Sequence, residues 1–452
     1  MSRLFTRALA CGALCLIAAA YACDAGHGFV KDDFGWILAS RDWSTLLEAP
    51  TGFFRPVVSV SFALNYAVFG LEPLGYGLTN LAMLYACLGA LVLLLRALGL
   101  ASFPATASAL LWALNFQGIN MAVLWTSGRT ALLLTLWGVA AASAFTLRHR
   151  VAAALFAALA MGSKEEAFML PAVLTVWAFI DARQRGGNHR DSARTVARET
   201  WLLWMAFAVM LVLRSDSGAF TPASAPPLYR YVFDLATLAG NLSGYADRVG
   251  TTPLLALLVF WLAAGMPRPG VDADHRRLVA KGVVWIALGF APTILLPLRS
   301  SLYGVMPGVG MAIIVAALAE RVAASVAPRV LARAALVLLV AFAALLPVYR
   351  LRNARYVREA ELSAVIVAEL SRISASSPSG GLVVIRDVRT SRPTAEQAFG
   401  PLADRAALLM TDGKLQVWIE PPPVELAGVT PPDLSQAIAT LVVEQGVVKR
   451  NP

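Results

Sequence analysis

The sequence predicts an all-α polytopic membrane protein that carries a small α/β domain outside the membrane, and three observations support this fold class. Of the 452 residues, 58% are hydrophobic and only 15% are charged, a balance outside the range of soluble globular domains. The basic residues concentrate in short loops between apolar runs, and the C-terminal part contains short strand-like segments. We therefore expect a membrane domain over residues 1–349 and an extramembrane segment over 350–452.

Eleven apolar runs can be placed as spans of the hydrocarbon core, which is about 30 Å thick. With the N-terminus in the cytoplasm, every strongly basic short loop falls on the inner side, as the positive-inside rule requires. The first 22 residues also resemble a secretory signal, but the segment after them emerges outside in either case. The expected spans are residues 8–22, 76–95, 103–117, 130–147, 151–162, 167–180, 199–213, 251–266, 282–298, 302–319 and 334–349.

This topology assigns the long non-spanning stretches 23–75 and 214–250, together with the C-terminal segment, to the outer side. Chemistry is therefore expected there, with the C-terminal domain periplasmic or extracellular. The net charge of +10 reflects membrane orientation and not a nucleic-acid partner. The Ala- and Arg-rich composition fits a bacterial inner membrane.

The C-terminal segment reads as a linker followed by a small domain. Residues 371–381 are rich in Ser, Gly and Pro, as linkers are. Residues 382–388, LVVIRDV, and residues 414–420, KLQVWIE, are typical of short strands.

Ionisable residues are nearly absent from the interiors of the expected spans, and this weakens a transporter interpretation, since transporters hold such groups near the midplane. A transporter or flippase of a lipid-linked substrate nevertheless stays as the alternative. One outer loop is unusual: only 14 residues, about 21 Å of helix, separate Arg150 from Lys164. We expect Lys164, Glu165 and Glu166 to lie recessed in a hydrated cavity, unless the helices tilt little and the loop reaches the interface unaided.

Asp32 and Asp33 follow the first span and are flanked by aromatic residues. Adjacent side chains diverge, so one of the two is expected to point into any site. A carboxylate here could act as a general base on an acceptor hydroxyl. The structural alternative is an N-cap and first-turn pair for a helix that starts near Phe34.

Cations also gather at the predicted outer ends of spans. They occur in four short motifs, and arginine and lysine side chains of this kind can hold a phosphate. Taken singly, each could equally be an interface anchor. The motifs are FFRP at 53–56, WTSGR at 125–129, SKE at 163–165 and RSSLY at 299–303.

The order of these motifs resembles a known family. The segments GFVKDDF at 28–34, LNYxxFGLEPLGYxLTN at 64–80 and PGVG at 307–310 complete the series. Over roughly residues 5–320 the chain is similar to the protein O-mannosyltransferase-like glycosyltransferases of the GT-C superfamily. It is closest to the membrane half of the transmembrane and tetratricopeptide-repeat proteins and to their bacterial relatives.

The resemblance implies a GT-C fold and an inverting transfer of a sugar, of hexosyl or mannosyl type, from a polyprenyl-phosphate donor. The acceptor would be a protein, glycan or lipid on the outer face, and membrane lipids would surround the protein. In this reading Asp32 or Asp33 is the catalytic base. The donor phosphate would be bound by Arg129, Lys164, Arg299 and Tyr303, with Glu165 and Arg55 as orienting residues.

The chain departs from these relatives at two places. Gly77 stands where they usually have a histidine, and a second histidine near Leu84–Tyr85 is absent. The repeat array is missing as well. A divalent metal is therefore left open, and no ligand spacing in the sequence indicates one. A non-catalytic scaffold that presents the C-terminal domain is a further alternative.

Overall fold

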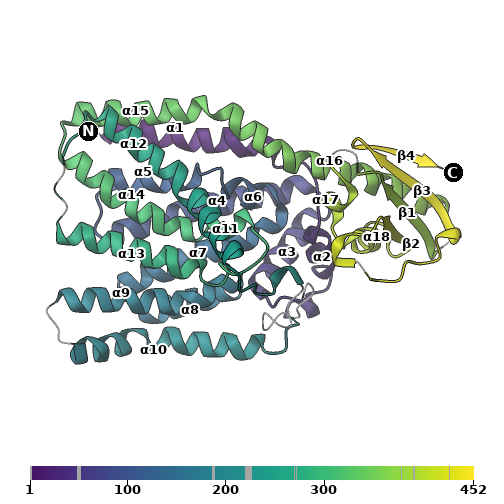
Figure 1. Ribbon diagram of the computed structural model, residues 1–452, viewed down its shortest axis with the longest axis horizontal. Coiled ribbons are helices and arrows are strands. Elements are labelled where there is room, and N and C mark those ends of the chain that lie inside the picture. The colour runs from purple at the N-terminus through teal and green to yellow at the C-terminus, as the bar shows by residue number, and fades with distance from the viewer. Residues whose placement is uncertain are drawn as a thin grey trace. The chain divides into compact units, whose positions relative to one another are not determined.

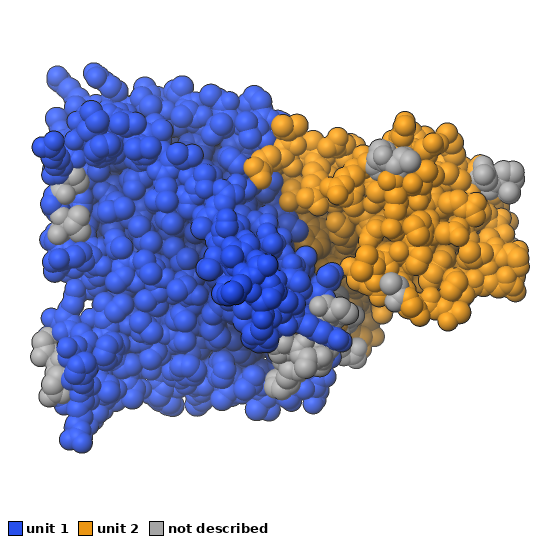
Figure 2. Space-filling view, in the orientation of Figure 1, with its two compact units in different colours: residues 1–23, 81–123, 128–350 blue, residues 24–80, 124–127, 351–452 orange. Residues whose placement is uncertain are grey.

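The computed structural model describes residues 3–47, 52–185, 189–218, 227–268, 270, 272–377, 379–389, 392–426 and 428–451. The chain divides into two compact units, coloured separately in Figure 2. Unit 1 comprises residues 1–23, 81–123 and 128–350, and unit 2 comprises residues 24–80, 124–127 and 351–452. Residues 48–51 of the first predicted outer stretch and residues 219–226 of the second lie outside the described part of the chain.

Unit 1 is built of helices (Figure 1). A π-helical turn, Asp247–Thr251, joins two of them, α11 and α12, into one continuous segment. The helices are α1 (Arg3–Tyr21), α4 (Pro73–Ala97, which begins in unit 2), α5 (Ser102–Ala113), α6 (Ile119–Leu124), α7 (Arg129–Thr146), α8 (Arg150–Met161), α9 (Leu170–Gln184), α10 (His189–Arg214), α11 (Leu235–Ala246), α12 (Thr252–Ala263), α13 (Ala273–Phe290), α14 (Pro307–Ala324) and α15 (Pro328–Ala344).

Each predicted apolar run overlaps one of these helices, and proline sets several of the helix starts. Proline occupies the first turn of α9, α12, α14 and α15, where its missing N–H costs no hydrogen bond. The largest displacement is at the run 282–298, because α13 ends at Phe290 and Pro292 and Pro297 follow it. A proline inside a helix would remove a backbone hydrogen bond and clash with the preceding turn.

Five helical segments of the described chain are long and apolar enough to cross a membrane, or six if the bent pair α15 and α16 is one span. The protein is therefore an integral, polytopic membrane protein. Several other predicted spans form shorter helices, such as the 12-residue α8, and their crossing of the bilayer stays a prediction. The five segments are Pro73–Ala97, Thr126–Thr146, His189–Arg214, Leu235–Ala263 and Ser301–Ala324.

Small residues let the helices of unit 1 approach closely. A Cβ atom placed on Gly282 of α13 would lie 2.6 Å from the carbonyl oxygen of Gly310 on α14. One placed on Gly310 would lie 2.5 Å from the carbonyl oxygen of Gly282. Glycines at such a crossing replace side-chain bulk with backbone contact, as is common between membrane helices.

Unit 2 contains the predicted α/β domain. Its sheet has the order β2-β1-β3-β4, in which β1 pairs parallel with β2 and β3, and β4 pairs antiparallel with β3. The strands predicted at 382–388 and 414–420 are confirmed as β1 and β2. The elements are α2 (Asp32–Ala39), α3 (Pro56–Phe69), α16 (Leu346–Ser376), β1 (Gly381–Asp387), α17 (Ala395–Phe399), α18 (Ala403–Thr411), β2 (Leu415–Glu420), β3 (Ala437–Glu444) and β4 (Val447–Asn451).

Two features of unit 2 differ from the sequence expectation. The linker predicted at 371–381 is wrong over its first half, because α16 continues to Ser376. The β3–β4 hairpin was not predicted. Its turn residues Gln445 and Gly446 both have positive φ, the conformation that two-residue hairpin turns favour.

The segment after the first helix packs against the C-terminal part of the chain within unit 2. The ring of Phe34 on α2 stacks on Phe399 of α17, with centroids 5.6 Å apart. Arg41 donates a hydrogen bond to the carbonyl oxygen of Leu409 on α18. The predicted outer loop and the C-terminal domain thus share one core, and this core positions the aspartate pair.

Candidate active site

Asp33 is fully buried and its carboxylate is fully engaged. One carboxylate oxygen, Oδ1, accepts hydrogen bonds from the backbone N–H of Ser127 at 2.7 Å and from the Ser127 hydroxyl. The other, Oδ2, accepts from the backbone N–H of Val30 at 2.9 Å. Burial raises the pKa of Asp33 to about 7, against the opposing effect of these hydrogen bonds. Asp33 therefore ties the start of α2 to the Ser127 segment.

Asp32 differs from its neighbour in both exposure and bonding. It is half-buried, and its carboxylate accepts no hydrogen bond from the residues that the structure describes. Burial raises the pKa of Asp32, while the charges of Arg55 and Lys31 act to lower it. Asp32 is therefore the member of the pair whose carboxylate is available to a ligand.

The start of α2 confirms part of the alternative interpretation, in which the two aspartates are the N-cap and first-turn residues of a helix. Both lie in the first turn of α2, where a carboxylate interacts favourably with the helix dipole. The helix begins at Asp32, two residues before the expected start at Phe34, and Lys31 is the N-cap residue. The first-turn position and the availability of Asp32 are compatible with each other.

Lys31 connects this turn to the C-terminal segment. Its backbone N–H donates to the carbonyl oxygen of Ala398 at 2.9 Å. Its ammonium group lies 3.0 Å from the buried carboxylate of Glu359 on α16, which also accepts a hydrogen bond from Arg355 at 3.1 Å. Lys31 has φ of 50°, an uncommon conformation for a side chain that is not glycine. These contacts hold the backbone next to Asp32 in a fixed position.

Arg55 is placed on the same unit by the start of α3. It is the N-cap residue of that helix and precedes Pro56. Its guanidinium lies 4.5 Å from the ring centroid of Phe53. The same charge acts electrostatically on Asp32, so Arg55 can orient or balance that carboxylate.

In unit 1, the recessed charges of the 163–166 loop are paired. The Lys164 ammonium lies 2.6 Å from the Glu166 carboxylate, and both side chains are buried. The same ammonium lies 4.7 Å from the ring centroid of Tyr303. Glu165 forms an ion pair at 2.8 Å with Arg214, a residue at the end of α10 that the sequence analysis did not single out. Partners of this kind lower the cost of burying charge.

Arg299 lies in the same unit but is exposed. Arg248, in the π turn, donates hydrogen bonds to the carbonyl oxygens of Ser300 at 2.9 Å and Arg299 at 3.3 Å. The Arg248 guanidinium also lies 5.7 Å from the ring centroid of Tyr245. Arg248 was also missed, although it falls in the predicted outer stretch 214–250 and π turns often mark functional sites.

Arg129 is fully buried at the first residue of α7. It belongs to unit 1 with Lys164, Glu165, Arg299 and Tyr303, whereas both aspartates and Arg55 belong to unit 2. Within unit 1, Lys164 and Tyr303 are in contact. The convergence of the aspartates and these cations in one pocket stays a prediction.

Among the described residues there is no preformed metal site. No group of three or more His, Cys, Asp or Glu side chains among them converges in ligating geometry. The oxygens of Asp33 already accept protein hydrogen bonds. His27, the histidine nearest in sequence to the aspartates, contacts the carbonyl oxygen of Asp24, and burial lowers its pKa.

The chain resembles known proteins in structure, but not in sequence. No family model and no curated protein matches the chain. Among solved structures, the chain is similar to ArnT from Cupriavidus metallidurans, crystallised with undecaprenyl phosphate bound. The sequences are 14% identical, the TM-score is 0.49, and the match covers 90% of this chain and 85% of that one. The similarity concerns the course of the chain and assigns no role to a residue.

Proposed function

We propose that this protein is an inverting GT-C-type glycosyltransferase that moves a sugar from a polyprenyl-phosphate donor to an acceptor on the outer face of the membrane. The observation that carries the proposal is the contrast between the two aspartates. Asp33 is committed to three hydrogen bonds, whereas Asp32 is half-buried and accepts none from the described residues. A general base needs an oriented carboxylate that is not engaged in structural bonds.

In the proposed reaction Asp32 removes the proton from the acceptor hydroxyl as its oxygen attacks the anomeric carbon. The new glycosidic bond forms on the face opposite the phosphate, which inverts the configuration at that carbon. The bond between the anomeric carbon and the phosphate oxygen breaks, and the polyprenyl phosphate leaves with the electron pair. Burial raises the pKa of Asp32. Its carboxylate is therefore a stronger base than that of an ordinary aspartate, and it is better matched to proton transfer near neutral pH.

The donor phosphate is assigned to the cations of unit 1. Lys164 would act as a point charge and Arg129 and Arg299 as bidentate donors, with the Tyr303 hydroxyl as an additional donor. The contact between Lys164 and the Tyr303 ring supports the grouping of these two residues. Glu165, through its ion pair with Arg214, orients the cations that bind the donor phosphate. Arg55 orients Asp32.

The finer assignments rest on the motif series described in the sequence analysis. We propose a hexose of mannosyl type as the transferred sugar and a protein hydroxyl, a glycan or a lipid of the envelope as the acceptor. The proposed location is the bacterial inner membrane, with the N-terminus cytoplasmic and the C-terminal domain outside.

A donor screen with the full-length protein in nanodiscs tests the proposal. The protein is incubated with a panel of polyprenyl-phosphate sugars and extracted envelope acceptors, and the release of polyprenyl phosphate is measured together with sugar transfer. We expect release and transfer in equal amounts with at least one donor, and neither with Asp32→Asn.

The alternative function predicts a different result. A transporter or flippase would move a labelled polyprenyl-phosphate sugar across proteoliposomes without releasing polyprenyl phosphate. Movement of this kind, equal in the wild type and Asp32→Asn, would overturn the proposed transferase.

A further inference from the structure

Unit 1 contains an apolar cavity of about 100 Å³ that the proposed reaction does not use. Residues of α1, α5, α12, α14 and α15 line it. Of these helices, α5 contacts α1, α12 and α14, and α15 contacts α1 and α12. On α14 the cavity begins at Val315, 12 residues and about 18 Å beyond Tyr303. It is therefore separate from the charged cluster around Lys164.

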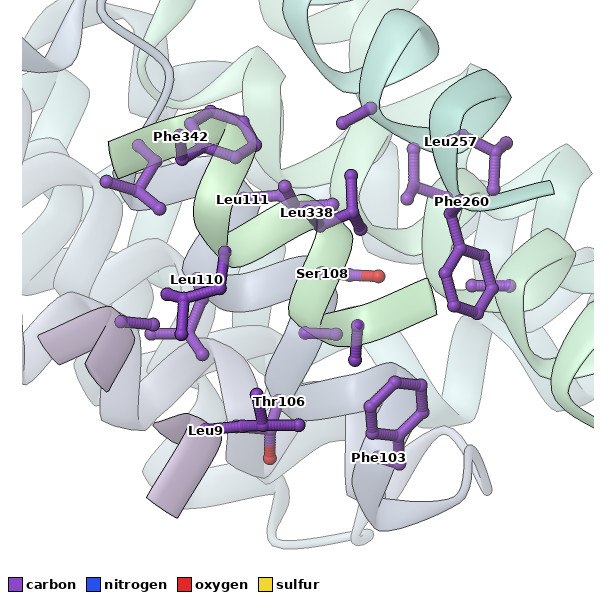
Figure 3. Close-up of a pocket in the computed structure, with 18 of the residues that line it drawn as sticks. Leu9, Phe103, Thr106, Ser108, Leu110, Leu111, Leu257, Phe260, Leu338 and Phe342 are labelled. Carbon is purple, nitrogen blue, oxygen red and sulfur yellow. The ribbon is translucent and has the colours of Figure 1, made fainter. Parts of the chain in front are cut away.

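One polar group in this cavity has no partner. The Ser108 side chain is 1% exposed, and its hydroxyl has no hydrogen bond within the described structure. Figure 3 shows this side chain directed into the space between apolar side chains such as Leu338 and Phe260. A buried hydroxyl without a partner is unfavourable, so the arrangement indicates a ligand that is mainly hydrocarbon and carries a hydrogen-bond acceptor.

The helices around this cavity indicate that such a ligand comes from the membrane. α12 belongs to a segment apolar enough to span a membrane, and so does the bent pair that begins with α15. On their outer surfaces Leu255 and Val340 are 56% and 59% exposed. These surfaces suit contact with lipid, so the hydrocarbon that can enter between the helices is a lipid chain.

The lining of the cavity follows α5 over most of its length. It extends from Phe103 to Leu114, about 16 Å of helix. Ser108 lies six residues after the helix start at Ser102, or about 9 Å. The unpartnered hydroxyl therefore lies near the middle of a lining that is otherwise mainly apolar.

We propose that this cavity binds the ester-proximal part of one acyl chain of a glycerophospholipid, with the Ser108 hydroxyl donating a hydrogen bond to the ester carbonyl of that chain. A polyprenyl tail offers no such acceptor along its length. This inference is independent of the proposed transferase activity, and a failed transfer assay would leave it standing.

Photolabelling of the full-length protein tests the site. Nanodiscs contain phosphatidylethanolamine with a diazirine on one acyl chain, and labelled peptides are mapped by mass spectrometry. We expect label on the α5 and α15 residues that line the cavity. Ala335→Phe and Ala319→Leu, which fill the cavity from two different helices, should remove that label. Leu336→Phe, on the lipid-facing side of α15, should retain it.

Ser108→Ala tests the hydrogen bond without filling the cavity. We expect it to reduce labelling of the lining residues by about fivefold, the effect of losing one neutral hydrogen bond. Equal labelling of the lining residues in the wild type and in both filling variants would overturn the proposal. Displacement of the label by excess polyprenyl phosphate, but not by unlabelled phospholipid, would overturn the assignment to an acyl chain.

Discussion

The two aspartates should respond differently to the same isosteric change. In Asp33→Asn the amide has a single oxygen, yet two backbone N–H groups, those of Val30 and Ser127, donate to separate oxygens of the native carboxyl group. One of these N–H groups must then face the new NH₂ group and lose its acceptor. Asp32→Asn removes no hydrogen bond formed by the described residues.

The size of the effect follows from this count. A buried donor left without an acceptor costs about 1–3 kcal/mol, so Asp33→Asn should lower the free energy of unfolding by that amount. The comparison is best made near pH 3, which is below both the folded-state pKa of Asp33, about 7, and the ordinary aspartate pKa of about 3.9, so that Asp33 is mostly protonated in the folded and in the unfolded chain. The loss of charge then contributes little. Asp32→Asn should leave stability unchanged and lower the transfer rate by about 10²–10⁴-fold, the usual contribution of a general base.

Thermal unfolding followed by tryptophan fluorescence, together with the transfer assay, separates the two outcomes. Asp42→Asn is the control, because Asp42 is exposed and asparagine can still accept the hydrogen bond that Ser44 donates to it. It should alter neither measurement. If Asp33→Asn keeps wild-type stability but abolishes transfer, while Asp32→Asn keeps transfer, then the roles assigned to the two residues are reversed.

Three further perturbations test the surroundings of Asp32. Arg55→Ala removes a charge that lowers the pKa of Asp32, so the acidic limb of the kcat/KM profile should move to higher pH; an unchanged limb would exclude Arg55 as an electrostatic partner. Glu359→Gln should lower the free energy of unfolding by about 1–2 kcal/mol, which is less than the roughly 3–5 kcal/mol expected for breaking a fully buried ion pair. The smaller value is expected because the Lys31 side chain is 32% exposed. Equal melting temperatures of this variant and the wild type would contradict a stabilising Lys31–Glu359 ion pair. A chain ending at residue 349 should insert but lack transfer activity, since it lacks the groups that hold Lys31; full activity of this chain would show that the C-terminal domain is dispensable.

Local patterns in the sequence were sufficient to locate most helices and half of the sheet. Apolar runs located most helices of unit 1, although α6 and α11 were not predicted, and two strand-like segments located β1 and β2. Residues 437–451 show why the hairpin was missed: the mixed polarity of β3 and β4 hides the strands, although the Gln445-Gly446 pair is a recognisable turn signal.

The environment of the aspartates could not be read from local patterns, because long-range contacts create it. Ser127, which holds Asp33, is 94 residues away in the chain. Glu359, which holds Lys31, is 328 residues away. The principle that adjacent side chains diverge was enough to predict that one aspartate would be available, but not which one. Arg214 and Arg248 were missed because each sits alone at a helix end or turn, without a motif around it.

The bond from the Lys31 N–H to the carbonyl oxygen of Ala398 has a consequence for biosynthesis. Lys31 is translated 367 residues before Ala398. The backbone beside Asp32 therefore cannot reach its final geometry until the helices α4 to α15, which lie between these two residues in the chain, have been synthesised. A nascent chain that stops before Ala398 would carry Asp32 without this hydrogen bond, and under the proposed function it would be inactive.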